Sequence, residues 1–119
     1  MPLVDVRYNS DLVGLPALLA LRELLPLVVS HALHVPANPA AHLTEKDIEV
    51  RFSPFGPFDV SSFPLEITVN SLYFEEREDA LAGQLELAKQ MISKTPAIIG
   101  ISFFIFVQMS RGAFVEHKT

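Results

Sequence analysis

Residues 2–10 read Pro2-Leu3-Val4-Asp5-Val6-Arg7-Tyr8-Asn9-Ser10, and residues 63–71 read Phe63-Pro64-Leu65-Glu66-Ile67-Thr68-Val69-Asn70-Ser71. The dipeptide Pro-Leu aligns in the two stretches, and Asn-Ser recurs one residue earlier in the second. In both, apolar residues occupy alternate positions, which is typical of a half-buried β-strand. This alternation puts Pro2 on the same side of its strand as Val4 and Val6. The pattern that opens the chain therefore returns near its middle.

Each of these two strands is followed by a helical pattern. Residues 12–35 are mostly apolar, and Pro16 near the first turn costs little because its missing N–H has no helical partner there. Pro26 lacks a donor in the helix interior, so we expect it to kink or split this helix. Residues 75–93 begin with an acidic first turn and end before Thr95-Pro96. The apolar stripe of this second helix consists of Leu81, Leu85, Ala88 and Ile92.

Two further strands complete the pattern. Residues 47–53 alternate, with Ile48, Val50 and Phe52 on one side and Glu49, Arg51 and Ser53 on the other. Residues 101–109 are nearly all apolar, which predicts a strand buried on both faces. The order is strand, helix, strand, a turn-rich linker at residues 54–58, then strand, helix, strand. Each helix is long enough for a right-handed crossover between parallel strands.

This order predicts an α+β fold, a two-layer sandwich of a four-stranded mixed sheet with two helices on one face. We expect a single domain over residues 1–119, with repeated halves at residues 2–53 and 64–109. The other face of the sheet, with Val4, Ile67 and residues 103–106, would be exposed in a monomer. Other subunits would then cover it.

The composition points the same way. Half of the 119 residues are hydrophobic, and a domain of this size buries roughly 65 to 70% of its unfolded surface. Hydrophobic surface is therefore left over, and self-association is its expected cover. The net charge is −5 and the nine Lys and Arg residues are scattered, which disfavours nucleic-acid binding. The chain has no cysteine, which suits a reducing compartment, and we expect a cytoplasmic protein.

Residues 12–35 have the length of a membrane span, but they contain Arg22, Glu23 and two histidines. A charge at the centre of a span costs about 2.5 to 3.5 kcal/mol. We therefore expect a helix of a soluble protein and no membrane partner. Residues 97–109 are more apolar, but a spanning helix needs about 20 residues and this run is shorter.

The Met-Pro start, the two strand-helix-strand units and the run Asp47-Ile48-Glu49-Val50-Arg51-Phe52 together resemble the tautomerase superfamily. Some of its members, such as 5-carboxymethyl-2-hydroxymuconate isomerase and macrophage migration inhibitory factor, fuse two units in one chain and form trimers. The resemblance implies a homo-oligomer, expected to be a trimer, that isomerises a small enol or keto carboxylic acid. It implies no cofactor and no metal.

The resemblance also implies a set of site residues. Once Met1 is removed, the secondary amine of Pro2 would be the general acid and base, and Arg51 would hold a substrate carboxylate. A register shifted by two residues would put Glu49 in that place instead. Phe103 and neighbouring phenylalanines would line the pocket. A second arginine that often follows the first strand is absent, because the loop reads Asn9-Ser10-Asp11, and Arg7 or Arg111 would have to replace it.

Elementary chemistry supports the role of Pro2. A free α-amino group titrates near about 7.7 to 8.0, and burial among apolar groups lowers the pKa of an ammonium. A base with a pKa near the working pH is what proton transfer requires. Pro64 cannot take this role, since its nitrogen is part of a peptide bond.

Three other interpretations stay open. The chain could be a non-catalytic binding or structural oligomer with a capped amino terminus, or a different α+β sandwich in which the repeat is a coincidence. Arg51 could be an ordinary solvated strand residue, and the phenylalanines could be core and interface. His31, His34 and His42 have a spacing that could hold a metal, although surface or capping roles are expected for them.

Overall fold

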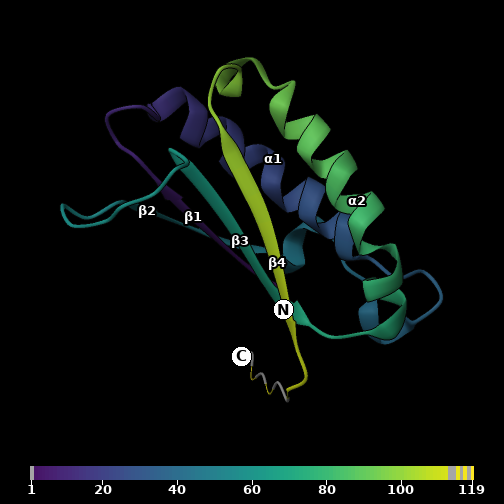
Figure 1. Cartoon of the computed structure of the whole chain (residues 1–119). Helices are drawn as coiled ribbons and strands as arrows, with labels where there is room; N and C mark the ends of the chain where they lie inside the picture. Colours follow the sequence, from purple (N-terminus) through teal and green to yellow (C-terminus); the bar gives the residue numbers. More distant parts are fainter. Residues whose placement is uncertain (1, 113–114, 116, 118) are drawn as a thin grey trace.

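The computed structural model describes residues 2–112, 115, 117 and 119. Four strands form one sheet in the order β2-β1-β3-β4 (Figure 1). Their bounds are Leu3–Tyr8 for β1, Glu49–Pro54 for β2, Leu65–Leu72 for β3 and Phe103–Ser110 for β4. β1 is parallel to β2 and antiparallel to β3, and β3 is parallel to β4.

Helices α1 (Leu15–Leu33) and α2 (Glu75–Ser93) both lie on one face of the sheet, as Figure 1 shows. Each helix joins two parallel strands, α1 between β1 and β2 and α2 between β3 and β4. The predicted α+β sandwich with a four-stranded mixed sheet is therefore confirmed. The bounds predicted for the second helix agree with those of α2.

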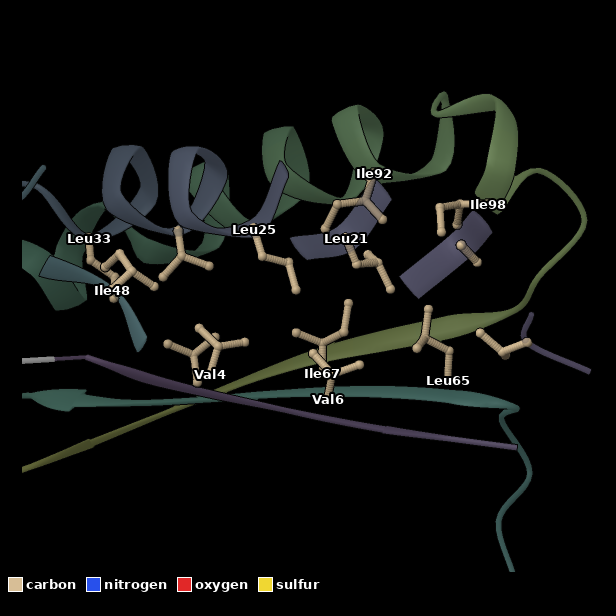
Figure 2. Packing of buried hydrophobic residues seen from close by; sticks show 14 residues of the cluster. Val4, Val6, Leu21, Leu25, Leu33, Ile48, Leu65, Ile67, Ile92 and Ile98 are labelled. Carbon is tan, nitrogen blue, oxygen red and sulfur yellow. The ribbon is translucent and has the colours of Figure 1, made fainter. Parts of the chain in front are cut away.

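The side of the sheet that the helices cover is the apolar one. Val4, Val6 and Ile67 are fully buried there, opposite Leu21 and Leu25 of α1 (Figure 2). The expectation that Val4 and Ile67 line the exposed face is therefore wrong. The strand alternation divides these residues correctly, but burial of apolar area draws the helices onto the side that carries them.

The open side carries mostly polar residues with two phenylalanines. The strand register sets Arg51, Asp5, Thr68 and Phe106 in one row across this face, and Ser53, Arg7, Glu66 and Phe104 in the next. Phe106 is 55% exposed. The prediction that the last strand is buried on both faces is wrong for the single chain, because β4 is an edge strand and its outward residues have no cover.

Helix α1 runs through Pro26 without being split, and Pro16 lies in its first turn as predicted. Among the described residues it is the one helix with the length and hydropathy of a membrane span. Its inner side packs on the sheet, with Leu21, Leu25 and Leu33 at most 1% exposed. Apolar side chains on its outer side stay uncovered: Leu15 is 67% exposed and Leu19 is 48% exposed.

The segment between β2 and β3 forms a loop that projects beyond the end of the sheet (Figure 1). The carboxylate of Asp59 accepts the N–H of Gly56 at 2.7 Å and forms an ion pair with Arg7. The hydrogen bond from Gly56 and the Arg7 guanidinium together lower the pKa of Asp59. Phe58 of this loop is 95% exposed. Asp59 thus ties the loop to Arg7 of β1, while the neighbouring apolar side chain stays in solvent.

Candidate functional site

Pro2 lies at the amino-terminal end of β1, one of the two inner strands of the sheet. It is buried, and its carbonyl accepts the N–H of Glu49 at 3.1 Å. The alternation of β1 puts Pro2 on the side that the helices cover. Continuing the strand pairing by one residue beyond Leu3 sets Ile48 on one side of Pro2 and Ser71 on the other. Met1, whose removal the predicted chemistry requires, lies outside the described residues.

A buried arginine lies next to this position. Arg77, in the first turn of α2, is 3% exposed. It donates hydrogen bonds to the Leu33 carbonyl at 2.7 Å, to Ser71 Oγ at 2.8 Å and to the Leu72 carbonyl at 2.8 Å. A longer contact of 3.5 Å reaches the Ala41 carbonyl. The guanidinium therefore joins the end of α1 to the end of β3, and one of its partners, Ser71, occupies the position next to Pro2 when the strand register is continued.

All four oxygen atoms that Arg77 binds are uncharged. Among the described residues, no carboxylate forms an ion pair with it. Burial lowers the pKa of Arg77, as it does for any cation removed from water, but the guanidinium stays charged at neutral pH. The Leu33 carbonyl is one of the last carbonyls of α1, and the partial negative charge at that helix end offsets part of the cation.

Sequence reasoning missed Arg77, although a signal for it was present. The apolar stripe of α2 begins at Leu81, and one helical step of four residues further back leads to Arg77. Arg77 also interrupts an otherwise acidic first turn. An arginine on the inner stripe of an amphipathic helix, among acids that stay in solvent, indicates a buried cation with a structural or functional task.

The rim of this end of the sheet carries Tyr73 and Arg111. The N–H of Tyr73 extends the β3–β4 pairing to the Ser110 carbonyl at 2.9 Å. The Arg111 guanidinium lies 4.6 Å from the centre of the Tyr73 ring. The hydrogen-bonded carboxylate of Glu78 raises the pKa of the Tyr73 hydroxyl. Of the two arginines considered as replacements for the missing one, Arg111 therefore lies at the same end of the sheet as Pro2.

The other candidate cations lie elsewhere. Arg51 is on the open face, where its side chain is 68% exposed and lies 3.5 Å from Glu49. Arg7 lies on the same face further along β1 and pairs with Asp59. Because Pro2 is on the covered face, a single chain does not bring Arg51 and Pro2 together.

Phe103 is also distant from Pro2 within one chain. It pairs with Leu65 at the start of β4, whereas the Pro2 end of the sheet lies at the opposite end of that strand. Phe103 lines a cavity of about 200 Å³ with Leu85 of α2. Arg77 lines a separate cavity of about 390 Å³ with Ala32 and Gln84. The three predicted site residues thus occupy three different places in the chain.

The histidines lie beside the end of α1. The rings of His34 and His42 stack with their centres 4.8 Å apart, and His34 Nδ1 accepts the N–H of Leu43 at 2.9 Å. His42 Nε2 lies 2.8 Å from the Pro36 carbonyl. His31 and His34 border a groove of about 640 Å³ that none of the predicted site residues lines. Within the described residues, no group of three or more His, Asp or Glu side chains could hold a metal ion.

Comparisons with known proteins agree with this architecture. A macrophage migration inhibitory factor-like protein from Entamoeba histolytica superposes with a TM-score of 0.60 over 98% of this chain and 95% of its own, at 12% identity. 5-Carboxymethyl-2-hydroxymuconate delta-isomerase superposes with a TM-score of 0.55 over 100% of this chain and 87% of its own, also at 12% identity. The chain has the tautomerase fold.

A third solved structure with this fold, fused 4-OT in a wild-type symmetric trimer, gives a TM-score of 0.52 at 15% identity. It covers 92% of this chain and 85% of the other. No protein-family model matches the sequence, and no curated protein sequence matches it. The resemblance predicted from the Met-Pro start and the repeated unit is therefore confirmed at the level of the fold. The chemistry has to be argued from the residues of this chain.

Proposed function

We propose that the chain is a keto–enol tautomerase in which the secondary amine of Pro2, freed by removal of Met1, is the general acid and base. The observation that supports this proposal most directly is the position of Pro2 at the amino end of an inner strand, buried on the apolar side of a tautomerase fold. Burial deprives the ammonium form of the amine of its hydration and destabilises it relative to the neutral form, so the pKa of the amine falls toward neutrality.

The reaction needs no external proton source. The neutral amine takes the hydroxyl proton of the enol and becomes an ammonium, which then delivers this proton to carbon as the C=C electron pair forms the new C–H bond and C=O forms; the reverse transfers regenerate the enol. A base whose pKa lies near the working pH can both take and return a proton. The substrate class we propose is a small keto or enol carboxylic acid, because cations gather at this end of the sheet: Arg77 behind Pro2 and Arg111 on the rim.

Arg51 and Phe103 can belong to the same site only if they come from another subunit. We propose a homotrimer in which the edge strands β2 and β4, which carry Arg51 and Phe103, meet neighbouring chains, so that these two residues approach the Pro2 of another chain. The partly exposed Phe106 and the uncovered edges of β2 and β4 support this arrangement. The fused 4-OT structure, which shares the fold, is a symmetric trimer.

The test is turnover with a matched pair of proline variants. Protein whose intact mass shows loss of Met1 is assayed with phenylpyruvate or 2-hydroxymuconate, alongside Pro2→Ala and Pro64→Ala. Pro64 opens the corresponding strand of the second half but has no free amine, so its replacement is expected to leave the rate within about threefold. Pro2→Ala replaces the secondary amine by a primary amine without the ring that fixes its direction, and we expect a loss of about 100-fold, which lies within the usual contribution of a well-positioned general base. Equal rates for Pro2→Ala and the unmutated protein would refute the proposal.

The same scaffold also supports a second candidate, a non-catalytic oligomer. The observation that favours it is that Arg77 already uses its donors on protein oxygens and Arg51 already pairs with Glu49. A native mass that retains Met1, together with trimers in light scattering and no turnover, is the result expected for this candidate. Turnover that depends on Pro2 removes it.

A further inference from the structure

Arg77 lies at the end of the sheet where Pro2 is found, and three of its properties bear on how Pro2 would work. Its guanidinium is buried, it is bound by neutral oxygens, and it reaches the strand position beside Pro2 through Ser71. If the antiparallel register of β1 and β3 continues one residue beyond Leu3, Ser71 is the partner of Pro2, and partners of this kind have Cα atoms about 4.5 to 5.5 Å apart. Water is largely excluded from the space between the guanidinium and Pro2, since Ser71 is 7% exposed and Ile48 is 9% exposed.

We propose that Arg77 is a positioning residue whose buried positive charge keeps the freed amine of Pro2 unprotonated near neutral pH. This inference rests on the proposed role of Pro2 as base and adds a second cause to apolar burial. A cation nearby destabilises the ammonium form of the amine and leaves the neutral form unaffected. The effect is large here because a buried charge is screened far less than an exposed one.

The hydrogen bonds of Arg77 fix its position. The Leu33 carbonyl holds Nε from α1, and Ser71 Oγ and the Leu72 carbonyl hold one terminal nitrogen from β3. The ring of Phe74, 4.9 Å from the guanidinium carbon, covers another part of it. Because the acceptors are neutral, they fix the guanidinium without cancelling its charge as a carboxylate would.

Other titratable groups occur at this end of the sheet, and they are less suited to this role. They are His34 near α1, Asp47 and Glu49 at the start of β2, Tyr73 after β3, Glu76 and Glu78 on α2, and Arg111 after β4. Asp47 caps its own short helical turn, and Glu49 pairs with Arg51 on the open face. Arg111 is exposed, so solvent and salt screen its charge.

The measurement is the pH dependence of the chemical reactivity of the Pro2 amine. Chains cut from a fusion so that Pro2 is the first residue react with acetic anhydride between pH 5 and 10, and the mass of the amino-terminal peptide after proteolysis gives the rate at Pro2 separately from the lysines. The variants are Arg77→Met, which removes the charge, Arg77→Lys, which keeps it, and Arg111→Met as a matched exposed cation. No turnover is involved, so a chain without tautomerase activity would refute the proposed function and leave this inference standing.

We expect the pH midpoint of Pro2 acetylation to be roughly one pH unit higher in the Arg77→Met protein. Below the midpoint this is about a tenfold loss of Pro2 reactivity. Arg77→Lys and Arg111→Met should stay close to the unmutated protein. Equal midpoints for Arg77→Met and the unmutated protein would overturn the proposal. A rise in Arg77→Lys as large as in Arg77→Met would also overturn it, because the shape of the side chain would then matter and not its charge.

Should Arg77→Met fail to fold, Gln84→Glu decides in its place. Gln84 lines the same cavity as Arg77 and is only partly buried, so a carboxylate of nearly the same shape can be tolerated there. It would offset the guanidinium charge, and the midpoint should rise by a smaller amount in the same direction. An unchanged midpoint in this variant would count against the role of Arg77.

Discussion

Arg77 and Arg51 lie on opposite sides of the sheet, and the protein accommodates the two cations in different ways. Arg77 is 3% exposed and binds neutral oxygens on α1 and β3. The side chain of Arg51 is 68% exposed and lies 3.5 Å from the carboxylate of Glu49. The covered side thus solvates its cation with backbone carbonyls and a hydroxyl, whereas the open side uses water and an opposite charge.

Solvent exposure decides how strongly each of these charges acts on neighbouring groups. Ions at ordinary salt concentrations screen exposed charges over about 8 to 10 Å, so Arg51 contributes little beyond its own contacts. The field of Arg77 passes through buried protein, and the groups beside it experience it more fully. The apolar residues also differ between the two sides. Those on the covered side hold the helices on the sheet, and those on the open side, such as Phe106, are exposed in the single chain.

The largest difference in stability between the two sides is expected from adjacent residues of β3. Ile67 is fully buried under the helices, and Thr68 points to the open face. We expect Ile67→Ala to lower the free energy of unfolding by about 2 to 5 kcal/mol through lost burial and a cavity. Thr68→Ala should lower it by less than about 1 kcal/mol. Urea unfolding followed by circular dichroism measures both, and similar losses would mean that the open face is packed as tightly as the covered one.

The two arginines provide the next test. Arg77→Met leaves the Leu33 and Leu72 carbonyls without a donor, although it also removes the cost of burying a charge. We expect a net loss of about 2 to 4 kcal/mol in the free energy of unfolding. Arg51→Met breaks an exposed pair and should lose at most about 1 kcal/mol. Urea unfolding measures both losses. A larger loss for Arg51→Met would contradict the statement that the buried cation contributes more to stability than the exposed one.

The sequence predicted the elements more completely than their assembly. The bounds of α2 followed from its acidic first turn and from Thr95-Pro96, because both signals are local. The alternation along β1 divided its residues correctly between two faces. Which face the helices cover depends on contacts between distant segments. Local alternation does not contain this information, and the expectation that Val4 lies on the exposed face was therefore wrong.

The place of Pro2 at the start of a strand was predictable, and its surroundings were less so. Placing Arg51 relative to Pro2 requires the pairing of Asp5 with Arg51, and no local pattern gives that register. Arg77 could have been found, since it lies one helical step before Leu81 on the inner stripe of α2. The partners of its guanidinium come from α1, from the short helical turn Pro39–Ala41 and from β3, and this convergence belongs to the tertiary structure.

The smallest effect is expected at the Arg7–Asp59 pair, at the end of the sheet that carries the projecting loop. The Gly56 N–H and Arg7 lower the pKa of Asp59 below its ordinary value of 3.8. A carboxyl group with a lowered folded-state pKa stabilises the fold above its unfolded pKa, and this contribution is lost as the pH falls through the folded value. Asp59→Asn should therefore be slightly less stable than the unmutated protein at pH 7 and equally stable at about pH 2. Thermal unfolding at both pH values measures this difference, and a gap of the same size in acid would mean that the charge of Asp59 does not hold the loop.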